Sequence, residues 1–148
     1  MNESGLKIAH ELLERSYLFK TLDEDGRAEM KQLGQLVHVQ AGEVLIEEGS
    51  EGGSFYVLVS GRVKVSATKE GREIVLTELG RGAVLGEVAL ITGQPRTASV
   101  TALEPSTFIG FADPGISDFI ARHPKIKELL VRVLVHRAKD TVEKLTVS

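Results

Sequence analysis

The sequence of 148 residues contains no cysteine, which excludes a disulfide framework and thiolate chemistry. No apolar run approaches the roughly 20 residues that a helix needs to cross a bilayer. The first segment, MNESGLKIAHELLERS, is charged and amphipathic and lacks the apolar centre of a secretory signal. We therefore expect a cytoplasmic protein with no membrane partner.

The chain also has little excess charge. Its net charge of −3 gives no general reason to expect a nucleic-acid partner, because such partners attract basic surfaces. Apolar residues make up 42% and charged residues 26%, which is ordinary for a globular protein. The length fits one domain with a real core, spanning residues 1–148.

Signatures of catalysis are missing too. There is no nucleophile elbow, Walker loop or Ser-His-Asp arrangement. A metal-binding roll of the cupin type needs clustered histidines, but the four in this chain have no metal-ligand spacing: His10, His38, His123 and His136. Three glycines superficially suggest a dinucleotide loop, but they follow GxGxxxG rather than GxGxxG, without a βαβ unit: Gly80, Gly82 and Gly86. We expect no catalysis, no metal and no bound cofactor.

The periodicity divides the chain into three segments. Residues 3–35 have helical periodicity, with Asp23 as the expected N-cap of a second helix. Short runs of alternating apolar residues then follow at close spacing, separated by glycine turns, from Val37 to Phe111. The run 55–59 is apolar on both faces, so we expect it to be covered on both sides.

Helical patterns return after the strands. Pro114 suits the start of one helix, and Pro124 opens a longer one that runs to about Leu145. The expected fold is mainly β with helical ends, an antiparallel β-roll or jelly roll. The predicted segments are N-terminal helices at 1–35, a β-roll at 36–112 and C-terminal helices at 114–146.

The stretch GEVALITGQPRTASV, residues 86–100, concentrates the chemistry that the rest lacks. A helical turn after Gly86 offers free N–H groups, which suit an anion, and Gly86 lets a ligand approach the backbone. Arg96 can bind the same anion through paired hydrogen bonds. Glu87 cannot bind the anion and is expected to accept a hydrogen bond from a hydroxyl, such as that of a ribose. Anion and hydroxyl side by side indicate a nucleotide.

This stretch resembles the phosphate-binding cassette of cyclic nucleotide-binding domains, which we place at residues 86–98. Three further motifs match that family in order: AGEVLIEEG (41–49), SFYVLVSGRVKV (54–65) and LGRGAVLGE (79–87). The resemblance extends from about Leu18 to Val142, and the nine-residue step from Glu87 to Arg96 is the family's usual spacing.

The resemblance implies a site for cAMP or cGMP, with a role for each matching residue. The cyclic phosphate would be held by Arg96, Ala89, Leu90 and Thr97. The ribose would be held by Gly86, Glu87 and Val88. The base would contact Val65, Thr77 and Thr97. In the family a hydroxyl at the position of Thr97 contacts the 2-amino group of a guanine, but domains that prefer cAMP also carry Thr or Ser there. We favour cAMP.

The resemblance also implies that ligand draws the cassette inward, so that Leu90 moves and the C-terminal helices re-dock, sometimes as a lid over the base. The last helix has a coiled-coil-like stripe, which leaves three roles open: packing on the roll, a lid, or a homodimer seam. The stripe consists of Val131, Val135, Ala138, Val142 and Leu145.

We expect a stand-alone sensor that binds a cyclic mononucleotide and signals to an effector protein or through a homodimer. The alternatives are a sensor fragment of a transcription regulator, channel or kinase regulatory subunit, and a degenerate roll that binds no nucleotide. A regulator of the catabolite activator type would need a helix-turn-helix after the long helix, and none follows it here.

Overall fold

The computed structural model describes residues 3–86, 93–132 and 135. Helices open and close this part of the chain, and strands occupy the middle. In chain order the elements are α1 (Glu3–Arg15), η1 (Tyr17–Phe19), α2 (Glu24–Leu33), β1 (Gln35–Val39), β2 (Val44–Ile46), β3 (Phe55–Ser60), β4 (Val63–Lys69), β5 (Arg72–Leu79), β6 (Val84–Leu85), β7 (Ser99–Ala102), β8 (Ser106–Phe111) and α4 (Gly115–Arg122). Residues 124–132 are also helical.

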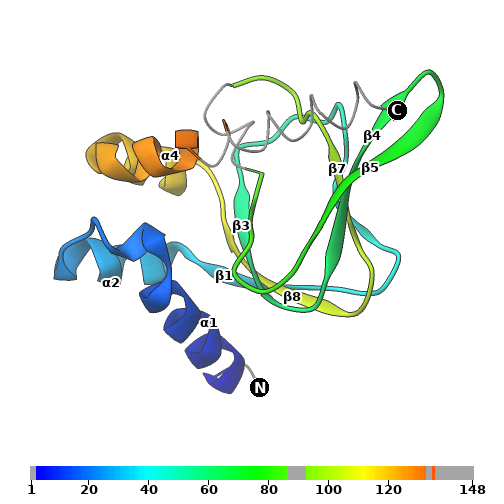
Figure 1. The fold of residues 1–148 in the computed structure, drawn as a ribbon. Coiled ribbons are helices and arrows are strands. Elements are labelled where there is room, and N and C mark those ends of the chain that lie inside the picture. The colour runs from blue at the N-terminus through cyan, green and yellow to red at the C-terminus, as the bar shows by residue number, and fades with distance from the viewer. Residues whose placement is uncertain (1–2, 87–92, 133–134, 136–148) are drawn as a thin grey trace.

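The strands in the described part of the chain form two antiparallel sheets of four strands each. Their orders are β1-β8-β3-β6 and β2-β7-β4-β5, so strands distant in sequence lie side by side in both. Figure 1 shows the helices α1, α2 and α4 gathered on one side of this roll, and β4 and β5 on the other. The predicted fold class, mainly β with helical ends, is confirmed.

The first sheet is buried on both faces because its strands alternate between two cores. Along β3, Phe55 and Val57 pack with the helices, whereas Leu58 packs between the two sheets. Strand β8 alternates in the same way. Ile109 packs in the core that the sheet forms with the helices, called the helical core below, and Phe108 packs in the core between the two sheets. The prediction that the run 55–59 is covered on both sides is therefore confirmed.

The helix boundaries follow local chemistry. Asp23 is the N-cap of α2, and its Oδ1 accepts a hydrogen bond from the Gly26 amide at 2.8 Å, as predicted. Pro114 is the N-cap of α4, as its predicted place at a helix start implies. The N-terminal helices end at Leu33, and β1 begins at Gln35, inside the segment predicted as helical. The chain turns there because Gly34 is extended and Gln35 pairs with β8.

The helix at 124–132 begins at the proline that was predicted to open it. Ile126 and Leu130 are fully buried in the helical core. Val135, by contrast, is 60% exposed. Val131, the first residue of the predicted stripe, is half-buried. Ala138, Val142 and Leu145, and with them the extension of the helix to Leu145, lie outside the described residues. Within the part of the chain that is described, no helix has the length and apolar content required to cross a membrane.

His10 is a titratable residue of α1 that lies near Lys31 of α2. Its Nε2 atom is buried and has no hydrogen-bond partner among the described residues. Burial lowers the pKa of His10 below 6.5, and the positive charge of Lys31 lowers it further. A hydrogen bond with the Lys31 backbone opposes this lowering of the pKa in part, and the charge of the Glu14 carboxylate opposes it less.

We expect the protein to lose stability as the pH falls through 6.5, because below this value the unfolded chain binds a proton on His10 that the folded chain does not. Thermal unfolding of the parent and of His10→Gln measures this loss of stability. The pH range, from about 7.5 to about 5.5, extends about one unit to either side of the ordinary histidine pKa. The parent's Tm should fall by roughly 2 °C more than that of the variant. His38→Gln, which changes an exposed histidine, is the control and should keep the parent's slope.

Candidate functional site

Arg96 is fixed by its backbone to the loop between β2 and β3. The Arg96 amide donates to the Ser50 carbonyl at 2.8 Å, and its own carbonyl accepts from the Gly49 amide at 2.8 Å. These bonds do not depend on the side chain, so they hold the segment before β7 against the loop whatever residue stands at 96. The side chain points into the fold, where only 8% of the residue is exposed.

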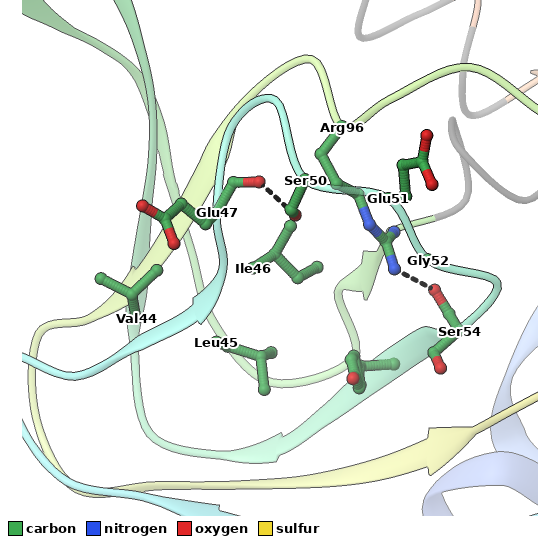
Figure 2. A pocket seen from close by; sticks show the side chains of 10 residues that line it. Val44, Leu45, Ile46, Glu47, Ser50, Glu51, Gly52, Ser54 and Arg96 are labelled. Carbon is green, nitrogen blue, oxygen red and sulfur yellow. Dashed lines mark hydrogen bonds between the residues drawn. The ribbon is translucent and has the colours of Figure 1, made fainter.

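The guanidinium lies between two backbone carbonyls. Its Nη1 donates to the Gly86 carbonyl and its Nη2 to the Ser54 carbonyl, both at 2.9 Å. Figure 2 shows the side chain directed from the segment before β7 toward Ser54 and Gly52. Because a guanidinium carries five N–H donors, these two bonds fix its orientation and leave donors for a further acceptor.

Gly86 makes room for this arrangement. Its φ of +88° is one that side chains disfavour. A Cβ at this position would lie 2.7 Å from Nη1 of Arg96 and 2.9 Å from the Ser54 carbonyl oxygen. The role predicted for this glycine from the sequence is to allow close approach of a ligand. The structure adds a second reason, which is close approach of the arginine itself.

The charge of Arg96 has no acidic partner in the described part of the chain. The ion pairs between described residues do not include Arg96, and the carbonyls that it contacts carry only partial charges. Burying a cation is costly unless an opposite charge compensates it. A bound anion would supply that charge, and a phosphate would also accept the remaining N–H donors.

Arg96 borders a cavity of about 350 Å³, within the range of small-molecule sites. One wall is apolar or aromatic, with Val44, Leu45, Ile46 and Tyr56. Arg96 is the one cation in the described lining, which also includes the carboxylates of Glu47 and Glu51. The combination of one buried cation and an apolar wall suits a ligand with a single anionic group and an apolar or aromatic portion.

The predicted base contacts lie on the same sheet as this cavity. Val65 on β4 pairs with Thr77 on β5 and with Val100 on β7, and Val100 pairs with the cavity residue Ile46 on β2. Directly paired residues share a face, so the four form one row across the sheet. With strands roughly 4.8 Å apart, the row spans about 14 Å from Ile46 to Thr77. Val65 and Thr77 are not in the described lining of the cavity, but they lie in the same row as Ile46, which is.

The other predicted contacts divide into two groups. Gly86 lies against Arg96, and Thr97 is exposed beside it. The remaining predicted ligands of phosphate and ribose lie outside the described residues: Glu87, Val88, Ala89 and Leu90. The structure therefore brings together Gly86 and Arg96 and leaves the cassette helix untested.

The contacts of Arg96 with the loop between β2 and β3 were not predicted from the sequence. Ser54 contributes a carbonyl, and a Cβ on Gly52 would lie only 3.0 Å from Nη2 of Arg96. The one sequence signal for this contact is the adjacent pair Gly52-Gly53 just before a strand. In the described part of the chain, no group of three or more His, Asp or Glu side chains could hold a metal ion.

A family model described as "Cyclic nucleotide-binding domain" matches residues 36–123, more than half of the chain. The chain belongs to this family. The match includes β1 from Leu36 onward, the described strands β2 to β8, Gly86 and Arg96, so the cavity beside Arg96 lies in the part that the family shares.

Three similar proteins show how this cyclic nucleotide-binding domain relates to longer chains. A "CRP-like cAMP-activated global transcriptional regulator" from Mycobacterium tuberculosis is 30% identical over 88% of this chain and 59% of its own length. A "cAMP-dependent protein kinase regulatory subunit" from Mycosarcoma maydis is 38% identical over 57% of this chain and 16% of its own. The regulatory domain of Toxoplasma gondii PKA, solved with cAMP, superposes with a TM-score of 0.72 at 28% identity, covering 83% of this chain and 46% of that one. The chain spans less than two thirds of each.

Proposed function

We propose that this chain binds a cyclic mononucleotide reversibly, with cAMP favoured over cGMP, and catalyses no reaction. The observation that carries the proposal is Arg96: it is buried, it is oriented by two carbonyls, it has no carboxylate partner in the described residues, and it borders a cavity of about 350 Å³. The names of the three relatives, each of which mentions cAMP, favour the adenine nucleotide.

In this proposal each part of the nucleotide has its own contacts. The row from Ile46 to Thr77 supports the base assignment, because a planar apolar base can lie along one face of the sheet. The cyclic phosphate binds Arg96, Ala89, Leu90 and Thr97. The ribose binds Gly86, Glu87 and Val88. The base contacts Val65, Thr77 and Thr97.

We further propose that the whole chain acts as one cytoplasmic sensor domain, with a β-roll at 36–112 and C-terminal helices at 114–146 that change position when the nucleotide binds. A ligand shifts such an equilibrium only by its differential affinity for the two states. The output passes to an effector protein or a second copy of the chain. Val135, which is 60% exposed on the predicted seam, supports a partner at that face.

The lengths of the relatives favour a second reading, in which this domain is the sensor of a larger regulator. The chain covers 59% of the transcriptional regulator and 16% of the kinase subunit, so those proteins carry other segments. The nucleotide site is the same in both readings, and the length of the natural gene product separates them.

Isothermal titration with cAMP and cGMP in parallel tests the proposed function. The protein is first unfolded and refolded to remove any nucleotide retained from purification. We expect saturable one-site binding, with cAMP binding more tightly than cGMP. Absence of heat and of thermal stabilisation with both nucleotides would mean that the roll is degenerate, and the proposal would be wrong.

Thr97→Ala tests whether the threonine reads the base. We expect its cGMP affinity to fall more than its cAMP affinity, because only guanine offers a 2-amino donor to the hydroxyl. Titration of both nucleotides into the variant measures the ratio. Thr21→Ala is the control, since Thr21 is exposed, lies before α2 and is not in the described lining of the cavity. Equal losses for the two nucleotides would make Thr97 a structural residue.

A further inference from the structure

Asp113 lies beside the loop that holds Arg96, although the two are far apart in sequence. Strands β3 and β8 pair antiparallel, with Phe55 opposite Phe111 and their rings stacked at 4.9 Å between centroids. Continuing this register by two residues beyond the strands places Gly53 opposite Asp113. The contact is therefore set by the sheet and does not depend on a chance approach of two loops.

The Asp113 carboxylate touches both the loop and a helix. Its Oδ2 lies only 1.8 Å from the position that a Cβ on Gly53 would take, so the carboxylate occupies the space of the missing side chain. Its Oδ1 accepts a hydrogen bond from the Ser117 amide at 3.1 Å and another from the Ser117 hydroxyl. Pro114, the N-cap of α4, makes no side-chain cap bond, and Asp113 supplies one in its place.

The two neighbours of Gly53 both contact Arg96. On one side, Gly52 lies against Nη2, and on the other, Ser54 accepts the Nη2 hydrogen bond. A continuous series of contacts thus leads from the guanidinium through residues 52–54 to Asp113 and the first turn of α4. At the other end of α4, Arg122 is ion-paired with Glu29 on α2, which joins α4 to the N-terminal helices.

We propose that Asp113 is a positioning residue of the nucleotide site, which holds residues 52–54 beneath Arg96 and couples occupancy of that site to the capping of α4. This inference rests on the proposed function. A phosphate that binds Arg96 fixes the guanidinium, and with it the Ser54 carbonyl and the glycine surface against which Asp113 packs. Occupancy therefore favours the geometry in which Asp113 caps Ser117. Because coupling between two sites is reciprocal, a nucleotide that stabilises the cap binds more weakly when the cap is lost.

The first test measures nucleotide binding. We expect Asp113→Ala to weaken cAMP binding by about five- to tenfold, the lower end of the range for coupling between two sites. Asp113→Asn retains an oxygen acceptor for the Ser117 amide and should recover most of the affinity. Asp25→Ala is the control, because it removes an exposed acid from the first turn of another helix, α2. Equal affinities for parent and Asp113→Ala, or an equal loss in Asp25→Ala, would overturn the proposal.

The second measurement is amide hydrogen exchange of Ser117 with and without cAMP. In the parent, cAMP should slow this exchange, and in Asp113→Ala a saturating concentration should leave it unchanged. If the cap is purely structural, Asp113→Ala would change the exchange rate equally with and without cAMP, and the rate in the parent would not depend on cAMP. That outcome would overturn the coupling even if Asp113→Ala is less stable than the parent.

A third measurement needs no nucleotide and separates the two proposals. Arg96→Gln should speed Ser117 exchange by about threefold or more through loosening of residues 52–54, since coupling between sites commonly reaches several-fold. Arg81→Gln, which changes an exposed arginine outside the cavity's described lining, should not change it. An unchanged rate in Arg96→Gln would overturn the link itself. A changed rate in a protein that binds neither cAMP nor cGMP would overturn the proposed function while showing that the link exists.

Discussion

Replacing Arg96 by alanine is expected to weaken cAMP binding at least tenfold while leaving the domain folded. A charge-assisted hydrogen bond contributes about 1.5–3 kcal/mol, so the loss of two bonds to the phosphate corresponds to a factor of about one hundred or more. No other cation in the described lining of the cavity can replace the guanidinium. Titration of cAMP into the parent and the variant measures the ratio of dissociation constants.

Two features of the structure argue that the variant remains folded. The backbone bonds of residue 96 to Gly49 and Ser50 do not involve the side chain. Removal of a buried cation without an acidic partner also relieves a desolvation cost, which offsets the loss of the two carbonyl contacts. We therefore expect a change in Tm of less than about 4 °C, equivalent to roughly 1 kcal/mol in a chain of this size.

Arg81→Ala is the control, since Arg81 is exposed and lies outside the described lining of the cavity. It removes the same charge from the protein, so a general electrostatic effect on an anionic ligand would appear in both variants. If Arg96→Ala binds cAMP as tightly as the parent, the phosphate site is elsewhere. If both variants weaken binding equally, the effect is one of net charge.

The fold could be predicted from the sequence because apolar residues that face the two cores alternate along the strands. Alternation along β3 and β8 places Val57 and Ile109 toward the helices and Leu58 and Phe108 toward the second sheet, and each face is apolar. Asp23 precedes its helix at a position where a short polar side chain can accept a backbone N–H. Such signals are local, so they need no knowledge of which strands pair.

The surroundings of Arg96 could not be predicted in the same way. Its partners are backbone carbonyls, and a carbonyl carries no residue identity from which a contact could be inferred. The contact of Asp113 with Gly53 likewise depends on the register between β3 and β8, which joins positions about 60 residues apart. The sequence identified Arg96 by its type and spacing, whereas the groups that orient it follow only from the folded chain.

Because the orientation of Arg96 depends on close approach to Gly86, we expect the substitution of Gly86 to have a large effect on cAMP binding and on stability. In Gly86→Ala the new Cβ would lie 2.7 Å from Nη1 of Arg96 and 2.9 Å from the Ser54 carbonyl oxygen. The guanidinium can move away, but the backbone carbonyl cannot move without displacing the start of β3. We expect cAMP binding to fall at least tenfold, because Arg96 leaves the position in which its donors face the cavity. We also expect a loss of stability of about 2–4 kcal/mol, from backbone strain at positive φ together with overpacking.

Gly82→Ala separates these two causes. Gly82 has nearly the same φ, +91° against +88° for Gly86, but a Cβ on Gly82 would meet no atom within 4 Å. It therefore incurs the backbone strain alone, roughly 1–2 kcal/mol, and cAMP affinity should stay within about twofold of the parent. Chemical denaturation and cAMP titration of both variants measure the two effects. If Gly82→Ala loses as much affinity as Gly86→Ala, strain in the turns weakens binding and the contact with Arg96 is incidental. If only Gly86→Ala loses it, the glycine is required because the phosphate-binding arginine occupies the space of its side chain.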